Sequence, residues 1–249
     1  MKLLIAGLVV GGLSLLWLFT YKFTCLSVFF MFVMIVVILI NEFKLKLTQR
    51  RCFANCYINQ NSFWYTFFQG RVFAFLSAFF SSVVFGVAYG VYLVKGGVFD
   101  YVFVGVSILF SYGIYFLFNK NGILSESVKF IISKNFASFS AALIVAFLIV
   151  VIEFNQTPPA YLDNSLSQTI KNASLIYSSC SYLNDFFELL REIEALEWWG
   201  IMKFSASNVN FYVKFIVWAL FLFGNVLALI GVNKMFLIIY EGKLFNGKK

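Results

Sequence analysis

The sequence predicts an all-α protein embedded in a membrane: a polytopic bundle of about six transmembrane helices. Three observations predict it. Hydrophobic residues make up 61% of the 249 residues, whereas soluble domains reach about 45–50% even when Gly is counted. Charged residues make up only 12%, too few to cover the surface of a soluble domain of this length. Several apolar runs are long enough to cross the roughly 30 Å of hydrocarbon in a bilayer.

Six apolar runs account for most of the chain. They are residues 3–19, 25–40, 72–94, 101–118, 136–152 and 212–240. Only residues 20–24 separate the first two runs, so these must form a tight antiparallel hairpin. The last run is longer than a simple span, and we expect its core to cross the membrane at residues 215–232. We interpret residues 1–249 as one transmembrane domain, with residues 153–209 inserted outside the membrane.

The distribution of charge predicts the orientation of the bundle. Cations gather in residues 41–71, in residues 119–135 and in the tail from residue 241. Acidic residues dominate residues 153–209. Because cytoplasmic loops carry excess Lys and Arg, we expect both termini in the cytoplasm and residues 153–209 on the opposite side. The cations at 41–71 have the density of an ordinary cytoplasmic loop, so we expect no nucleic-acid partner.

Small residues recur every four positions along the third run. The stripe comprises Gly70, Ala74, Ala78, Ser82, Gly86 and Gly90. Small residues at this spacing let transmembrane helices approach closely, which allows dispersion contacts to hold them together. The fifth run offers a matching stripe of Ser138, Ala142 and Ala146, and the first run offers Gly7 and Gly11. We favour packing within the chain, while a seam between copies and a pore lining stay open.

Residues 180–199 form an acidic amphipathic pattern within the outward segment. The residues that we assign to partner docking are Phe186, Leu190, Ile193, Trp198 and Trp199. Such a helix lies on the membrane interface, caps the bundle or binds another protein. Helices on a membrane surface are usually basic, so the acidic character favours capping or a protein partner.

The sixth run carries the candidate polar residues inside the membrane, which are Asn225, Asn233 and Lys234. An intramembrane cation is a functional hypothesis by default. However, Lys234 lies near an end of its run, so we expect it to extend to the interface as long side chains do. Glu42 and Glu241 also fall at the ends of runs, so we expect no carboxylate in a span core.

Several kinds of chemistry lack their usual residues. The chain has no His, which removes imidazole metal ligands and His general bases. It has no phosphate-binding glycine motif. We therefore expect no enzyme activity, no cofactor and no metal. Among the cysteines, we expect Cys52 and Cys56 to be free thiols. Cys25 and Cys180 fall on the same predicted outer side, where an oxidising compartment allows a disulfide. Because Cys25 starts inside the headgroup region, we expect the two cysteines to stay unpaired. Glycosylation of Asn155 and Asn172, whose motifs match acceptor sites, stays open.

These features favour a non-enzymatic integral membrane subunit of an oligomeric complex that serves as a channel, transport or scaffold component. We expect it to contact the lipid bilayer, to associate with itself or with other subunits, and to meet a cytoplasmic partner at residues 41–71. The richness in Phe, Asn and Lys indicates an AT-rich bacterial gene and hence the inner membrane.

The alternative function is the six-span permease subunit of an ATP-driven exporter that has a separate ATPase. The number of spans and the lengths of the loops resemble compact permeases of that group. The chain departs from them in lacking an amphipathic helix before the first span and in having a very short first outward loop. The resemblance concerns architecture alone.

Overall fold

The structure is a computed structural model that describes residues 2–59, 61–120, 126–154, 159–173, 178, 180–206 and 211–242. Of the residues that the structure describes, 88% are helical, and none of them is in a strand. Six helices of this described part are long and apolar enough to cross a membrane. The predicted fold class is therefore confirmed, and the chain is a multi-pass helical membrane protein by length and composition of its helices.

The six membrane-length helices are α1 (Lys2–Thr20), α2 (Ser27–Tyr57), α4 (Arg71–Lys95), α5 (Val98–Lys120), α6 (Glu126–Phe154) and α9 (Phe211–Tyr240). A short helix, α3 (Phe63–Gln69), joins α2 to α4. The segment between α6 and α9 contains α7 (Leu166–Asn172) and α8 (Ser181–Ala206). Helix α2 extends well past the predicted end of its span at residue 40, because the polar residues that follow still favour a helix.

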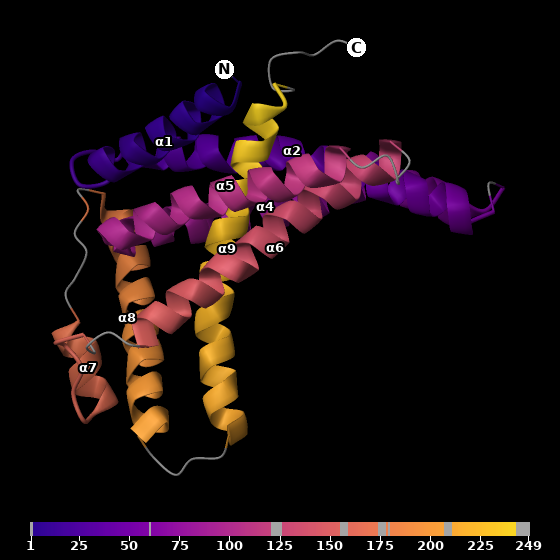
Figure 1. Cartoon of the computed structure of the whole chain (residues 1–249). Helices are drawn as coiled ribbons and strands as arrows, with labels where there is room; N and C mark the ends of the chain where they lie inside the picture. Colours follow the sequence, from indigo (N-terminus) through magenta and orange to yellow (C-terminus); the bar gives the residue numbers. More distant parts are fainter. Residues whose placement is uncertain are drawn as a thin grey trace.

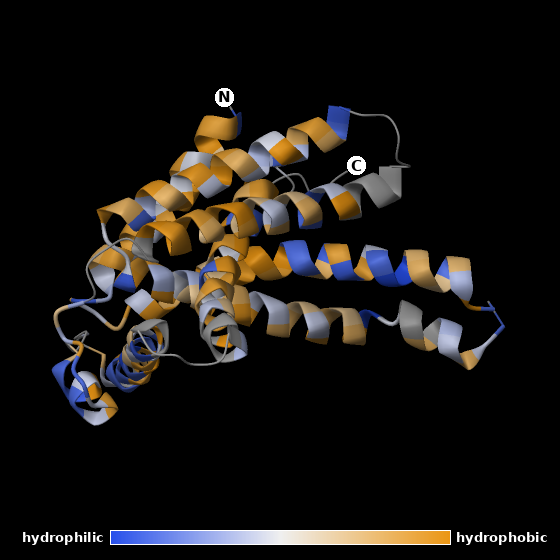
Figure 2. Ribbon diagram, turned by 60° about the horizontal axis from the view of Figure 1, so that its bottom comes forward, coloured by the Kyte–Doolittle hydropathy of each residue, from blue (hydrophilic) through white to orange (hydrophobic). Residues whose placement is uncertain are grey.

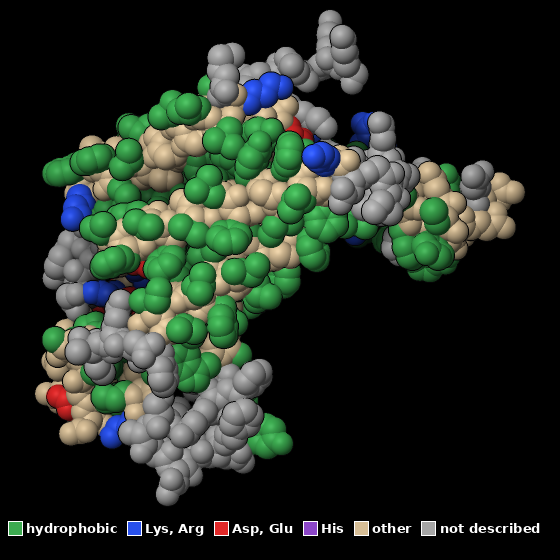
Figure 3. Space-filling view, viewed as in Figure 1, with side chains coloured by type: hydrophobic (Ala, Val, Ile, Leu, Met, Phe, Trp, Pro, Cys, Tyr) green, Lys and Arg blue, Asp and Glu red, His purple; other side chains and the backbone are tan. Residues whose placement is uncertain are grey.

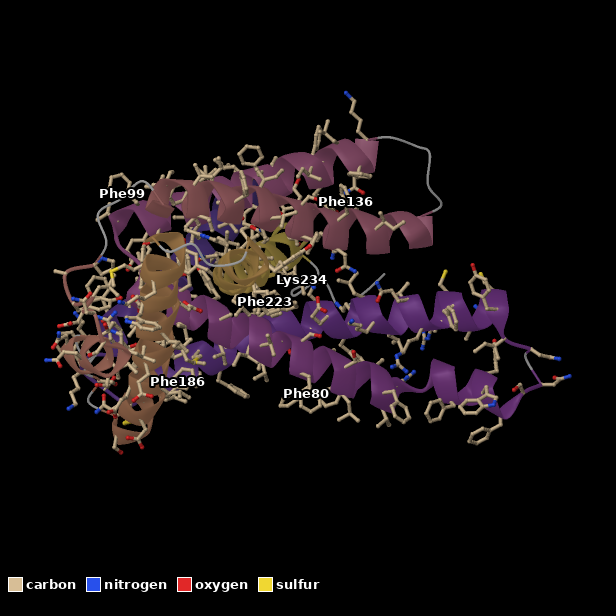
Figure 4. All side chains as sticks on the ribbon, turned by 90° about the horizontal axis from the view of Figure 1, so that it is seen from below. Phe80, Phe99, Phe136, Phe186, Phe223 and Lys234 are labelled. Atoms are coloured by element: carbon tan, nitrogen blue, oxygen red, sulfur yellow. A yellow bond between two sulfur atoms is a disulfide. The ribbon has the colours of Figure 1, made fainter. Side chains whose placement is uncertain are left out.

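Helix α9 forms the centre of the molecule. It runs across the other long helices (Figure 1), with the α2–α4 pair on one side and the α5–α6 pair on the other (Figure 4). Its C-terminal half is buried on all sides, from Ala228 to Ile239. All the membrane-length helices are apolar, but α9 also carries Asn233 and Lys234, which are buried. Polar side chains within a span face the interior of the bundle, which is consistent with the central place of α9.

Two glycines permit the closest helix contacts. A Cβ atom on Gly86 of α4 would lie 2.5 Å from Cγ1 of Ile35 on α2. A Cβ atom on Gly231 of α9 would lie 2.5 Å from the carbonyl oxygen of Phe85 on α4. Side chains at these positions would force the helices apart, so the absence of a side chain sets both distances.

The predicted small-residue stripe lies mostly on the buried face of α4. Ala74, Ala78, Ser82, Gly86 and Gly90 are all buried. Gly90 lies beside Met31 of α2 and beside Trp17 of α1, whose indole Nε1 donates a hydrogen bond of 3.0 Å to the Gly90 carbonyl oxygen. Gly70 lies outside the helix, at the junction of α3 and α4. Gly86 and Gly90 of the stripe thus pack on α2 and α1, and a seam between copies stays a prediction.

The matching stripe on α6 does not meet the stripe on α4. Ser138, Ala142 and Ala146 are buried, but α6 packs along α5 and α9, whereas α4 packs along α2 and α9. Gly7 and Gly11 on α1 have no atom of another element near enough to touch an added Cβ. Within the chain, the stripe on α4 therefore packs on α2 and on Trp17 of α1, and the matches that the sequence offers on α6 and at Gly7 and Gly11 are not formed. Pairing of these stripes between copies stays a prediction.

Large apolar side chains cover the outside of the bundle. Phe80 on α4, for example, is 67% exposed and points away from the core (Figure 4). The space-filling view shows apolar side chains spread along the long helices on this face, with charged side chains toward the ends of the bundle (Figure 3). A membrane protein presents such a surface to hydrocarbon, whereas a soluble monomer rarely exposes so much apolar area.

The helix connections separate into two groups. The α1–α2 turn, the α4–α5 junction, α7 and α8 lie at one end of the bundle, which we call the outer end (Figure 1). The C-terminal part of α2, together with α3, projects from the other end and carries many hydrophilic residues (Figure 2). We call this segment, residues 44–71, the arm. Which compartment each end faces stays a prediction. The alternation of the connections that the charge pattern predicts stays a prediction as well.

A disulfide between Cys25 and Cys180 ties the α1–α2 turn to the segment that begins α8. The contact is reinforced by Ser178, whose Oγ donates a hydrogen bond of 2.5 Å to the carbonyl oxygen of Tyr21. The rings of Tyr21 and Phe187 pack edge to face with centroids 6.0 Å apart. The outward segment is therefore fastened to the bundle where α8 begins. The expectation that Cys25 and Cys180 stay unpaired is wrong, because the fold brings the α1–α2 turn beside the start of α8.

We predict that only two cysteines react with a mass-tagged maleimide when the chain is denatured without reductant, namely Cys52 and Cys56. After reduction, all 4 cysteines should react. The Cys25→Ser variant should accept one extra tag before reduction, since it frees Cys180. Four tags on the unreduced wild-type chain would contradict the pairing.

We also predict that Gly231→Ala lowers the apparent Tm of the detergent-extracted protein, because the new Cβ meets the backbone of α4. Gly224→Ala on the same helix is the matched control, since a Cβ there meets nothing within 4 Å and Ala favours a helix over Gly by about 1 kcal/mol. Equal Tm values for the two variants would show that α9 and α4 do not cross so closely.

Candidate functional site

A buried ion pair joins α9 to α2. The Nζ atom of Lys234 lies 2.6 Å from Oε1 of Glu42, and the two side chains are only 10% and 3% exposed. The same Nζ lies 4.7 Å from the ring centroid of Phe85 on α4, where the face of the ring attracts a cation. Figure 4 places Lys234 at the centre of the bundle, between the two helix pairs.

A second buried ion pair joins the end of α9 to α6. The Nζ atom of Lys134 lies 2.7 Å from Oε2 of Glu241 and 3.4 Å from Oδ1 of Asn41 on α2. The hydroxyl of Tyr115 on α5 donates a hydrogen bond of 2.8 Å to Oε1 of Glu241. The two ion pairs therefore connect α9 with α2, α5 and α6.

Asn233 adds a neutral contact beside these pairs. Its Nδ2 donates hydrogen bonds to Oγ of Ser107 on α5, at 2.9 Å, and to the carbonyl oxygen of Ser138 on α6, at 3.2 Å. All three residues are fully buried. Buried polar groups are costly unless they find such partners, so these bonds fix how α9 lies against α5 and α6.

The structure corrects two expectations about these charges. Lys234 does not extend to the interface, because Glu42 offers a carboxylate inside the bundle. Glu42 and Glu241 do not lie at the surface either. Sequence reasoning missed the role of Glu42 and Lys134 because both lie at the edges of apolar runs. Only the crossing of α9 brings each beside a partner of opposite charge.

A cavity of about 530 Å³ lies at the outer end, between α4, α8 and α9. Its apolar wall includes Val87 and Val91 of α4, Ile193 and Trp198 of α8, and Phe221 of α9. Asn225 also lines it, while its Nδ2 donates to the carbonyl oxygen of Phe221 at 3.3 Å. Asn225 is thus part of the outer cavity and lies apart from Asn233 and Lys234.

One end of this cavity is charged. The Nζ atom of Lys95 lies 3.2 Å from Oε2 of Glu194 and donates to the carbonyl oxygen of Leu190 at 3.1 Å. Arg191 contacts the same carboxylate oxygen at 3.0 Å, and the hydroxyl of Tyr161 donates to Oε1 at 3.3 Å. Glu194 is therefore the acceptor around which this cluster is arranged.

Glu197 lines the cavity one helical turn beyond Glu194. Burial raises the pKa of its carboxyl, the nearby Lys95 opposes that rise, and the negative charge of Glu194 adds to it. Burial also raises the pKa of the Tyr161 hydroxyl, and Glu194 adds to this shift. Among the described residues, Glu197 has neither a hydrogen-bond partner nor an ion-pair partner.

The residues assigned to partner docking lie on α8, which packs against the bundle. Leu190, Ile193 and Trp198 line the outer cavity, and the ring of Trp198 packs edge to face on Phe221 with centroids 5.8 Å apart. Trp199 donates to the carbonyl oxygen of Asn164 at 3.4 Å. Phe186 packs against the core from outside (Figure 4). These contacts lie within the chain, and docking of a partner on α8 stays a prediction.

The arm, residues 44–71, carries the cations of the predicted cytoplasmic segment. Tyr57 is 78% exposed and Trp64 58% exposed. Within the arm, the hydroxyl of Tyr65 donates to Oδ1 of Asn55 at 3.0 Å. The guanidinium of Arg50 lies 5.8 Å from the ring centroid of Phe73. The cations are Lys44, Lys46, Arg50, Arg51 and Arg71.

Asn172 is an exposed residue at the end of α7, and Asn155 lies outside the described residues. Within the described ranges, no group of three His, Cys, Asp or Glu side chains is arranged to hold a metal ion. Comparison of the chain with protein-family models, with curated proteins and with solved structures found no match.

We predict that removing one member of the Glu42–Lys234 pair destabilises the protein strongly, by about 3–5 kcal/mol, because the other charge stays buried without a partner. Glu42→Leu and Lys234→Met should each lower the apparent Tm, and the double variant should recover most of the loss. Arg51→Met on the arm, where the side chain is exposed, serves as the control. Additive losses in the double variant would mean that the two residues do not interact.

We further predict that Glu197→Gln raises the apparent Tm at neutral pH by about 1–3 °C. The raised pKa means that the folded chain holds this proton more tightly than the unfolded chain does, so ionisation of Glu197 lowers stability as the pH rises. The difference between variant and wild type should shrink as the pH falls through the raised pKa and should vanish only below the ordinary pKa of the carboxyl, 4.5. A variant that is less stable at neutral pH would show that the carboxylate stabilises the fold.

Proposed function

We propose that the chain is a non-enzymatic, multi-pass subunit of an oligomeric complex in the bacterial inner membrane, with a channel, transport or scaffold role. The observation that carries the proposal is the arm. It projects from the bundle (Figure 1) and exposes aromatic rings beside cations. Aromatic residues and Arg are enriched where proteins bind one another, so we infer that the arm binds a cytoplasmic partner.

The two ends of the bundle support the proposed orientation. The disulfide between Cys25 and Cys180 lies at the outer end, and disulfides persist in oxidising compartments such as the periplasm. The cations of the arm lie at the opposite end, and positive charge favours the cytoplasmic side. The two arguments are independent, because one rests on thiol chemistry and the other on charge.

The buried ion pairs suit a subunit that keeps its shape. Lys134 and Lys234, the buried cations of the described chain, each have a carboxylate within 2.7 Å, so their charges are neutralised within the chain. The pairs and the hydrogen bond from Tyr115 hold α2, α5 and α6 in register around α9. They leave the arm and the lipid-facing surface for contacts with other subunits. The scaffold and channel roles both need such a fixed frame.

The second candidate is the permease subunit of an ATP-driven exporter. The specific observation that favours it is the outer cavity of about 530 Å³ at the end opposite the arm. A cavity on one side of the membrane and a docking element on the other are the two parts that a permease needs. In this case the arm would bind a separate ATPase.

We predict that companion proteins extracted with the tagged full-length chain in mild detergent are lost when Tyr57, Phe63 and Trp64 on the arm are replaced by Ala. Native mass spectrometry reports the copy number and the companions together. The control replaces Phe23 and Phe99, which are exposed at the outer end and belong to no predicted docking segment, by Ala and should keep the companions.

An ATPase among the lost companions would favour the exporter, and other membrane subunits would favour the scaffold or channel. A wild-type chain that is always monomeric and alone would contradict both proposals. An arm variant that keeps all companions would assign the aromatic rings to anchoring in the membrane interface.

A further inference from the structure

The outer cavity has apolar walls, and one of its ends carries more negative than positive charge. Val83, Val87 and Val91 of α4 and Phe221 of α9 form apolar walls. The ionisable side chains that line the cavity are Lys95, Asp100, Glu194 and Glu197. Its volume of about 530 Å³ is within the roughly 300–1,000 Å³ of small-molecule sites in proteins.

Most of these charges already have partners. Glu194 is paired with Lys95 and Arg191. Asp100 accepts hydrogen bonds from the backbone N–H of Gly97, at 2.7 Å, and from the hydroxyl of Tyr92, at 3.3 Å. Glu197 differs from them, since no described residue pairs with it. Its carboxylate is the one cavity-lining charge in the described chain that lacks a direct partner.

We propose that this cavity binds a monovalent organic cation with a bulky apolar body, and that Glu197 is the residue that binds its charge. The valine and aromatic walls would cover the body of the ligand, which the hydrophobic effect favours. The rings of Trp198 and Phe221 add faces to which a cation is attracted. The proposal does not depend on whether the arm binds a partner.

The charges argue against an anionic occupant. Lys95 and Arg191 both pair with the carboxylate of Glu194. Together with Asp100 and Glu197, the region has two cations and three carboxylates, a net charge of −1. A phosphate headgroup at this end would face like charges, which costs free energy. A ligand with a positive charge replaces that repulsion by attraction.

The test uses the purified full-length chain in nanodiscs of zwitterionic lipid and two probes of the same shape and opposite charge. After subtraction of the binding to empty nanodiscs of the same lipid, tetraphenylphosphonium should bind saturably, at one per chain, in equilibrium dialysis, and tetraphenylborate should not. Glu197→Gln should weaken tetraphenylphosphonium binding at least tenfold. Glu188→Gln is the control, because Glu188 is exposed on the same helix and lies outside the cavity.

A second variant tests the same site without changing its charge. Val87→Trp fills the cavity from the α4 side and should also weaken binding, while leaving the apparent Tm near that of the wild type. Equal binding of the two probes, or unchanged affinity in Glu197→Gln, would overturn the proposal. So would a tightly held phospholipid that tetraphenylphosphonium does not displace, since the cavity would then be a lipid site. The arm variants should bind the cation normally, which separates this test from that of the proposed function.

Discussion

The structure depends on neutralising two lysines inside an apolar bundle. Lys234 and Lys134 are held within 2.7 Å of Glu42 and Glu241, and each pair joins α9 to a different helix. A charge in such surroundings is tolerated only when it is paired. This requirement fixes where α9 crosses α2 and α6, and the close approach at Gly231 fixes where it crosses α4. The remaining helices are arranged around that crossing.

The two ends of the bundle then differ in character. At the outer end, the disulfide and the Lys95–Glu194 pair hold α8 against the bundle, and the space that α4, α8 and α9 do not fill becomes the cavity. At the other end, α2 continues beyond the core and forms the arm with α3. One end therefore has enclosed polar and apolar surface that suits a small ligand, while the other has exposed surface that suits a protein.

Composition and run length were sufficient to predict the helical membrane fold, because both reflect hydrocarbon as the solvent. They were not sufficient to predict which polar residues meet. Glu42 and Lys234 are far apart in sequence, and each lies at the edge of an apolar run, so neither signals its partner. The spacing of the small residues on α4 predicted that another helix packs closely there. It did not predict that this helix is α2, because small residues do not identify the helix that packs on them. The cavity was unpredictable for the same reason, because three distant segments form it.

The most direct test of α9 as the central helix is disulfide cross-linking in the native membrane. Asn233→Cys with Ser107→Cys, in a chain with Cys52 and Cys56 replaced by Ser, places thiols where the side chains now form a hydrogen bond of 2.9 Å. Mild oxidation should cross-link this pair within one chain, while Asn225→Cys with Ser107→Cys should not react. Cross-linking between positions 225 and 107, without cross-linking between positions 233 and 107, would show that α9 does not lie against α5 as described.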